Sequence, residues 1–118
     1  MKKAYITGAA LCLIAGLASA DTVKYETFFI KTGGESGRFY TQYIDPTDGH
    51  ESTYSDAGGS YTKEYQNIEL KKGDKLHVRH YRYEGDARGL SGCKIYLNGE
   101  AIKQDTGINK SECRYTVN

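Results

Sequence analysis

Residues 93–103 read Cys-Lys-Ile-Tyr-Leu-Asn-Gly-Glu-Ala-Ile-Lys, and this stretch decides the fold class. Cys93, Ile95 and Leu97 fall on one face of an extended chain, because side chains of a strand alternate sides with a period of two. Asn98-Gly99 is a dipeptide preferred in the two-residue type I′ hairpin turn. The stretch therefore predicts a β-hairpin in which the residues after the turn pair back on those before it, with the face of Cys93 in the core.

The chain after residue 20 continues the alternation of apolar and polar residues, broken by clusters of Gly, Asp and Asn about every ten residues, a rhythm typical of an all-β sandwich. Pro46-Thr47-Asp48-Gly49 and Lys71-Lys72-Gly73-Asp74 are turn signals, because proline fixes φ and glycine accepts positive φ. Residues 85–92 (GDARGLSG) are rich in glycine and predict a loop. The further expected strands are residues 23–31, 38–45, 60–65, 76–83 and 113–117.

The first twenty residues, MKKAYITGAALCLIAGLASA, have the layout of a cleavable secretory signal. Lys2 and Lys3 give a basic start, an apolar stretch of about ten residues follows, and Ala18-Ser19-Ala20 supplies a small-residue cleavage site. The apolar stretch is too short to span a bilayer, which needs roughly 20 residues. We therefore expect residues 1–20 to be removed and residues 21–118 to form one exported domain, periplasmic or secreted, without a transmembrane segment.

Two cysteines, Cys93 and Cys113, remain once the predicted signal, which holds Cys12, is removed. An even pair of cysteines in a small exported chain is more typical of a disulfide than of a metal or catalytic site. Closing the loop between them stabilises a fold by about 3 kcal/mol in the chain-entropy account. Cys113 shares a strand face with Tyr115 and Val117, so the bridge would tie the last strand to the strand that begins at Cys93.

The charge of the chain is close to balanced, with 16 Lys and Arg against 15 Asp and Glu. Removing Lys2 and Lys3 with the predicted signal leaves 14 basic residues against the same 15 acidic ones, a net charge of −1. Nucleic-acid-binding domains usually carry a marked basic excess. We therefore expect no nucleic-acid partner.

The sequence carries no signature of catalysis. His50, His77 and His80 stand near no nucleophile motif, and no G-x-S-x-G elbow occurs. His77 and His80 are three residues apart, which places them on opposite faces of a strand and argues against a shared metal ion. The turn at residues 45–49 lacks the oxygen ligands of a calcium loop. We expect no catalytic residue, metal or cofactor; a hydrolase built on scattered carboxylates stays open, because no two of them stand out.

The most unusual stretch is residues 71–88, where Lys, Arg and His alternate with tyrosine. Arg79, Tyr81 and Tyr83 share one strand face, and guanidinium groups beside aromatic rings suit anionic glycans, lipid headgroups or acidic partners. The alternative is an exposed cationic strand that prevents edge-to-edge aggregation. The candidate ligand-binding residues are Arg79, Tyr81, Tyr83, Arg82 and Arg88.

The opposite face of this strand changes character along its length. Leu76 and Val78 are aliphatic, whereas His80 on the same face is followed by the tyrosines. This change predicts a β-bulge near Arg79 or His80, which would alter the side chains that point inward.

The motif C-x-I-x-[VL]-[DN]-G-x-x-[VI], followed by a glycine-containing turn and a second cysteine, is matched by Cys93, Ile95, Leu97, Asn98, Gly99, Ile102, Gly107 and Cys113. With this motif and its opening Val23-Lys24-Tyr25-Glu26, the chain resembles the extracytoplasmic β-sandwich of the MmpS-like (mycobacterial membrane protein, small) families. The resemblance implies an immunoglobulin-like sandwich of about seven antiparallel strands, acting as an accessory or binding module beside lipid-exporting pumps. The cleavable signal departs from the membrane helix that those families typically retain.

These observations favour a function in binding, because the motifs specify a fold and carry no catalytic group. We expect an exported, non-enzymatic binding or accessory module of the bacterial envelope that recognises a protein, glycan or lipid partner. The alternative is a secreted inhibitor or toxin-associated subunit that acts on an envelope or host enzyme.

Overall fold

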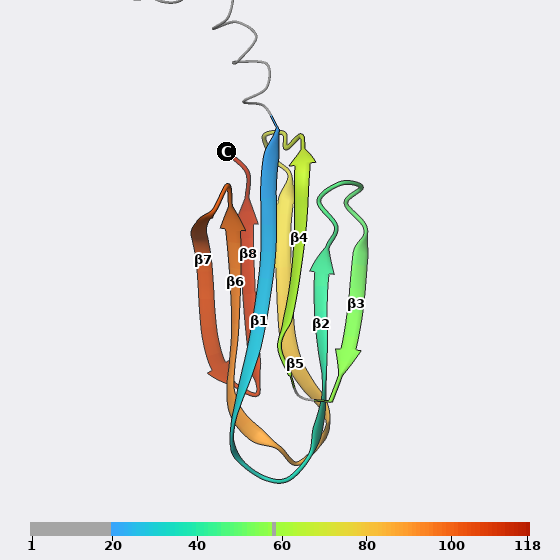
Figure 1. The fold of residues 1–118 in the computed structure, drawn as a ribbon, viewed down its shortest axis with the longest axis vertical. Helices are drawn as coiled ribbons and strands as arrows, with labels where there is room; N and C mark the ends of the chain where they lie inside the picture. Colours follow the sequence, from blue (N-terminus) through green and yellow to red (C-terminus); the bar gives the residue numbers. More distant parts are fainter. Residues whose placement is uncertain (1–19, 58) are drawn as a thin grey trace, which may run out of the picture.

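The computed structural model describes residues 20–57 and 59–118, which form two packed antiparallel sheets (Figure 1). The strand order is β4-β1-β6-β7 in one sheet and β3-β2-β5-β8 in the other. The predicted all-β sandwich with one disulfide is confirmed, with eight strands in the described residues. The strands are β1 (Asp21–Gly33), β2 (Gly37–Ile44), β3 (Glu51–Asp56), β4 (Tyr61–Ile68), β5 (Lys75–Gly85), β6 (Arg88–Leu97), β7 (Glu100–Ile108) and β8 (Lys110–Thr116).

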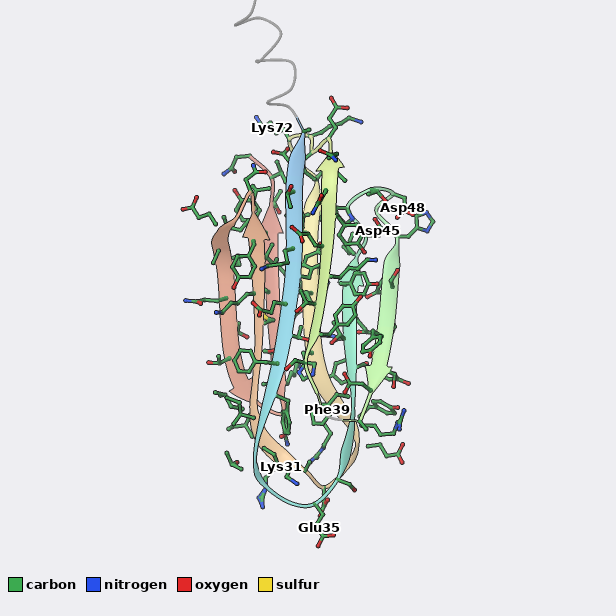
Figure 2. The ribbon with its side chains drawn as sticks, in the orientation of Figure 1. Lys31, Glu35, Phe39, Asp45, Asp48 and Lys72 are labelled. Atoms are coloured by element: carbon green, nitrogen blue, oxygen red, sulfur yellow. A yellow bond between two sulfur atoms is a disulfide. The ribbon has the colours of Figure 1, made fainter. Side chains whose placement is uncertain are left out.

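The two ends of the sandwich differ in what they carry. β1 begins at the upper end of Figure 1, where the C-terminus also lies, and the β1–β2 and β5–β6 loops lie at the lower end. Figure 2 places Lys72, Asp45 and Asp48 toward the upper end and Lys31 and Glu35 toward the lower end.

The predicted signal falls on residues that, apart from Ala20, lie outside the described part, and it stays a prediction. No helix in the part described is long and apolar enough to cross a membrane.

The hairpin predicted around Asn98-Gly99 is confirmed. Both turn residues have positive φ, 53° at Asn98 and 85° at Gly99, and Leu97 pairs with Glu100 across the turn. Cys93 and Ile95 are buried and Leu97 packs against the same core, as the alternation predicts. The second strand of the hairpin runs further than residue 103, to the end of β7, so that Gly107 of the family-like motif lies in a strand.

The disulfide between Cys93 and Cys113 links the two sheets, because β6 belongs to one and β8 to the other. Its two Cα atoms are 6.2 Å apart and both cysteines are buried. The bridge lies inside an apolar cluster, the upper core, whose buried members are Val23, Tyr25, Tyr43, Ile68, Leu76, Val78, Cys93, Ile95 and Cys113.

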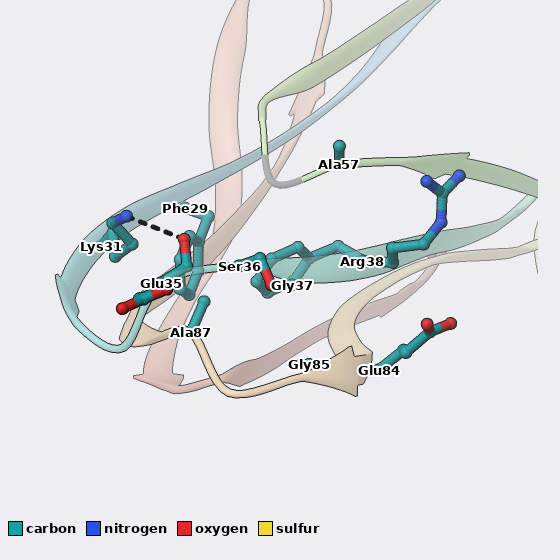
Figure 3. Close-up of a pocket in the computed structure, with 11 residues that line it drawn as sticks. Phe29, Lys31, Glu35, Ser36, Gly37, Arg38, Ala57, Glu84, Gly85 and Ala87 are labelled. Carbon is teal, nitrogen blue, oxygen red and sulfur yellow. Dashed lines mark hydrogen bonds between the residues drawn. The ribbon is translucent and has the colours of Figure 1, made fainter.

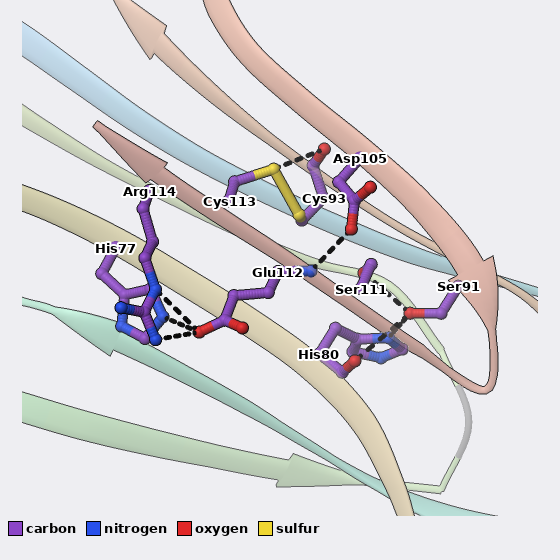
Figure 4. The surroundings of a disulfide bond; sticks show 9 residues. All are labelled: His77, His80, Ser91, Cys93, Asp105, Ser111, Glu112, Cys113 and Arg114. Atoms are coloured by element: carbon purple, nitrogen blue, oxygen red, sulfur yellow. Dashed lines mark hydrogen bonds and ion pairs between the residues drawn. A yellow bond between two sulfur atoms is a disulfide. The ribbon is translucent and has the colours of Figure 1, made fainter.

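A layer of hydrogen-bonded polar side chains lies in the interior next to the disulfide (Figure 4). Thr27 of β1 bonds to Thr41 of β2, with 3.0 Å between the hydroxyl oxygens. His80 Nδ1 lies 2.7 Å from Ser91 Oγ, which lies 2.9 Å from Ser111 Oγ. All five residues are buried, and each link joins one sheet to the other. We call these five residues the polar layer.

The loop predicted over residues 85–92 is wrong for most of its length, because β6 begins at Arg88. The small residues there serve close packing: a Cβ on Gly89 would lie 2.1 Å from the backbone oxygen of Ile30, and one on Gly92 would lie 2.1 Å from the ring of Phe28. Glycine inside a strand often marks such an approach.

The bulge in β5 lies at Tyr83 rather than near Arg79 or His80. Pairing with β8 is continuous from Lys75 to Tyr81, and the shift in register against β2 falls between Arg82 and Glu84. His80 faces inward as a regular strand residue, where its ring stacks on Phe39 and its Nδ1 bonds to Ser91. The change from aliphatic to aromatic residues along β5 therefore reflects its two different faces, and no bulge occurs at Arg79 or His80.

The Pro46-Thr47-Asp48-Gly49 turn signal predicts a hairpin, and this is confirmed, because β2 pairs with Glu51–Asp56, which forms β3 at the edge of its sheet. The sequence does not mark the bounds of this second strand. This strand is mostly exposed, so it lacks the buried apolar positions that give a strand its sequence signal.

Candidate binding face

Six side chains of β2 and β5 form a connected surface on the outer face of the β3-β2-β5-β8 sheet. Tyr40 pairs directly with Tyr81, and Gln42 pairs with Arg79 in the next row. The same rows continue outward, from Tyr40 to Ser55 of β3 and from Tyr81 to Lys110 of β8. We call this surface the tyrosine–arginine face; its members are Arg38, Tyr40, Gln42, Arg79, Tyr81 and Tyr83.

Three tyrosines form the centre of the face. The rings of Tyr40 and Tyr83 are stacked, with centroids 3.8 Å apart and planes 9° from parallel. Tyr40 also meets the ring of Tyr81 edge to face, at 5.7 Å. Tyr83 keeps 38% of its surface exposed, whereas Tyr40 and Tyr81 are half-buried. The result is an aromatic surface that packing has already ordered and that solvent still reaches.

One arginine lies at each end of the tyrosines. Arg79 lies 4.7 Å from the ring centroid of Tyr81, a cation–π contact, and its Nη2 donates to Gln42 Oε1. At the other end, Arg38 Nε donates to the hydroxyl oxygen of Tyr83 over 3.0 Å. Arg79 is therefore held against a ring, whereas the exposed Arg38 is bonded to the phenol of Tyr83.

The hydroxyl of Tyr83 has a second partner in Ser55, whose Oγ lies 3.2 Å away. The hydrogen bonds from Ser55 and then from Arg38 lower the pKa of Tyr83. The same hydrogen bond to Tyr83 raises the pKa of Arg38, which stays charged. These bonds position the phenol of Tyr83 and the guanidinium of Arg38 relative to each other.

The neighbouring part of the sheet holds an ion-pair cluster that balances its own charge (Figure 4). Arg114 donates to Glu112 Oε2 from Nη2 at 2.7 Å and from Nε at 3.0 Å, and His77 Nε2 lies 2.7 Å from the same oxygen. Arg114 and then His77 lower the pKa of Glu112. Lys110, which pairs with Tyr81, is exposed at the end of the Tyr40–Tyr81 row.

The structure brings together three of the five predicted binding residues. Arg79, Tyr81 and Tyr83 share the outer face, as the alternation predicts, but Arg82 and Arg88 lie elsewhere. Arg82 is partly buried and its Nη1 donates to the backbone oxygen of Ala87 over 2.5 Å, so it supports the β5–β6 loop. Arg88 begins β6 in the other sheet, opposite Gly33.

Sequence reasoning missed Arg38, Tyr40 and Gln42, which supply half of the face. The alternation in residues 38–44 does place these three on one side of a strand. What the sequence does not contain is the pairing of β2 with β5, which sets Tyr40 against Tyr81.

The interior holds a serine beside a histidine, an arrangement that in some hydrolases forms a nucleophile and its base. Ser91 is fully buried and His80 is 1% exposed, so no substrate reaches the pair. His77 and His80 lie on opposite faces of β5, as expected. No group of three or more His, Cys, Asp or Glu within the described ranges is placed to hold a metal ion.

Comparison of the sequence with models of known protein families and with curated proteins finds no match. The class of the protein is therefore defined by its own structure: an all-β, disulfide-linked sandwich of two four-stranded sheets.

Proposed function

We propose that the protein is an exported, non-enzymatic binding module that holds an anionic glycan on the tyrosine–arginine face. The observation that carries the proposal is the set of mutually packed rings of Tyr40, Tyr81 and Tyr83 with Arg38 and Arg79 bound at its two ends.

The chemistry of the face matches that of an acidic sugar chain. The C–H side of a pyranose ring is apolar and packs on a tyrosine ring, while its hydroxyls both donate and accept hydrogen bonds. The phenol of Tyr83 and the amide of Gln42 supply such partners. Guanidinium groups bind carboxylate or sulfate groups through paired hydrogen bonds, which suits Arg38 and Arg79.

The distribution of aliphatic side chains favours a glycan over a lipid. The strongly exposed aliphatic residues Ile30 and Ile108 lie on the other sheet, where each pairs with Leu90. Among the described outward-facing residues of β2, Ile44 is the one aliphatic side chain, and it lies at the far end from Arg38. A lipid tail or an apolar protein surface would find little aliphatic area on the tyrosine–arginine face.

Two further features fit an exported binding protein. The buried disulfide is of the kind that persists in oxidising compartments outside the cytosol. Ser91 and His80 are buried, so we assign them a structural role as members of the polar layer.

A binding assay with defined polysaccharides tests the proposal. We expect the protein to bind immobilised heparin or polygalacturonate more tightly than neutral dextran, and to bind more weakly as NaCl is raised, because salt screens exposed charges. Replacing Arg79→Gln together with Tyr81→Ala removes one guanidinium and one ring. This variant should bind at least about tenfold more weakly, a loss of about 1.4 kcal/mol.

The other sheet offers a matched control, because Lys24 Nζ lies 4.3 Å from the ring centroid of Tyr96 in a second cation–π pair. The Lys24→Gln, Tyr96→Ala variant changes the same charge and the same ring and should bind like the parent protein. Equal losses in both variants, or no preference for polyanions over dextran, would overturn the proposal. A stable complex with an enzyme in place of glycan binding would favour the inhibitor alternative.

A further inference from the structure

A pocket of about 420 Å³ opens at the lower end of the sandwich, where the two sheets separate (Figure 3). The rings of Phe29 and Phe39 form its floor, with centroids 4.3 Å apart. Ala87 lies beside them on the β5–β6 loop. The volume lies within the range of small-ligand sites in proteins.

The walls of the pocket are held in place by bonds between two loops. Asp86 Oδ1 accepts hydrogen bonds from the backbone nitrogens of Glu35 and Ser36, both at 3.1 Å. In return, Ser36 O accepts from the backbone nitrogens of Asp86 and Ala87, both at 2.8 Å. The β1–β2 and β5–β6 loops are therefore clamped together, and the pocket exists before any ligand binds.

The close approach of these two loops also explains why residue 85 is a glycine. A Cβ on Gly85, which has a φ of 97°, would lie 2.4 Å from Ser36 O. Because the loops approach this closely, a larger residue at Gly85 would force them apart and open the wall of the pocket.

The rim of the pocket carries both signs of charge on both sides. Figure 3 shows Lys31 and Glu35 on one side and Arg38 and Glu84 on the other. Lys31 Nζ donates to the backbone oxygen of Glu35 over 3.1 Å, which leaves the Glu35 carboxylate out of that bond. Donors and acceptors placed around an aromatic floor suit one sugar unit, whose hydroxyls need both, better than a compact anion.

The pocket ends inside the fold and does not continue through it. Phe39 is 1% exposed, and its ring stacks on His80 of the polar layer at 5.3 Å, with the planes 4° from parallel. Thr27, Thr41 and His80 behind it are buried and bonded. A ligand that enters the pocket therefore stops at the two phenylalanines.

Arg38 connects the pocket to the tyrosine–arginine face. It lines the pocket, and its Nε bonds to Tyr83 at the lower end of the face. A chain lying along Tyr81 and Tyr83 can therefore continue past Arg38 into the pocket.

We infer that the pocket receives the terminal sugar unit of a glycan whose preceding units lie on the tyrosine–arginine face. This inference rests on the proposed function and adds to it that the protein recognises chain ends. A blind pocket at the end of an open face accepts an end unit, whereas units in the middle of a chain would need a second exit.

The number of protein molecules bound per glycan chain tests the inference. Size-fractionated fragments of heparin and of polygalacturonate, from about six sugar units to several tens, are titrated by calorimetry. Recognition of ends predicts one bound protein per chain at every length. Replacing Lys31→Gln together with Glu84→Gln removes one charge from each side of the rim, and should weaken binding of the short fragments at least about tenfold. As a control, Glu100→Gln with Lys103→Gln changes the same charges on β7 and should leave binding unchanged.

The possible results separate the two proposals. End recognition is overturned if the number of protein molecules bound per glycan chain increases in proportion to chain length and the Lys31→Gln, Glu84→Gln variant binds like the parent protein. Binding on the tyrosine–arginine face would still stand in that case. If neither polysaccharide binds, both proposals are overturned. Circular dichroism and melting of each variant check that these substitutions of exposed residues leave the fold intact.

Discussion

His80 is a titratable residue in the interior of the sandwich, with 1% of its surface exposed. Its ring is buried between Phe39 and the hydroxyl of Ser91, and its Nε2 has no hydrogen-bond partner among the residues that the structure describes. Burial lowers the pKa of His80 because it disfavours the charged ring, an effect that the nearby Asp56 opposes in part. The folded protein therefore holds His80 neutral at pH values where an unfolded chain, with a pKa of about 6.5, begins to bind a proton.

This difference predicts that stability falls as the pH falls below about 6.5. The unfolded state binds more protons than the folded state there, so the free energy of unfolding decreases by up to about 1.4 kcal/mol per pH unit. A His80→Gln variant should be less stable at pH 7.5, because it loses the packing on Phe39, but should show a flatter dependence between pH 6.5 and 5. Urea unfolding at several pH values measures both.

His50 provides the control for this experiment, because it is exposed in the β2–β3 turn region. The His50→Gln variant should keep the slope of the parent protein. A slope that survives in the His80→Gln variant would show that another group binds the proton on unfolding.

At the scale of a single element, we expect the two glycines of β6, Gly89 and Gly92, to differ in how much stability is lost when each is replaced by alanine. Gly89→Ala places a Cβ against the backbone oxygen of Ile30, and a backbone cannot move aside without disturbing the pairing of β1 with β6. We expect a cost of about 2–3 kcal/mol, at the upper end of overpacking effects. The three atoms nearest to a Cβ at Gly92 belong to the ring of Phe28, a side chain that can change rotamer more easily than a backbone can move, so about 1 kcal/mol is expected.

Chemical unfolding of both variants, alone and combined with Phe28→Ala, checks this contrast. Removing the ring should abolish the cost of Gly92→Ala and leave that of Gly89→Ala unchanged. Equal costs for the two glycines would mean that β1 and β6 adjust to each other more freely than the close contact implies.

The same strand shows where sequence reasoning succeeds. Period-two alternation and the Asn98-Gly99 turn predict the hairpin and its buried face, because both signals are local. The identity of the disulfide also follows from local counting, since two cysteines remain outside the predicted signal.

Contacts between distant segments are what the sequence leaves out. Gly89 and Gly92 read as loop residues until β1 is placed against them. In the same way, Arg79, Tyr81 and Tyr83 are predictable as one face, but their partners on β2 depend on a pairing that no short motif encodes. The pocket depends on two loops separated by some fifty residues of chain, which meet through the carboxylate of Asp86.

For the whole molecule, the disulfide adds a covalent cross-link between two sheets that the chain also connects through its loops. Replacing both cysteines by alanine, Cys93→Ala and Cys113→Ala, should lower the free energy of unfolding by about 3 kcal/mol, because the unfolded chain regains the freedom of the open loop. Thermal or urea unfolding measures the loss, and glycan binding on the outer face should persist in the folded variant. An unchanged melting temperature would contradict a stabilising role for the bridge.

The position of the C-terminus determines how attached copies of the protein would be oriented. The C-terminus and the start of β1 lie at the upper end, and the pocket lies at the lower end (Figure 1). A copy coupled to a bead or scaffold through its C-terminus would therefore point its pocket outward, away from the support. Arrays built in this way would present many receptors in one orientation, and a branched polymer with many tips would attach by avidity where a linear one of equal mass would not.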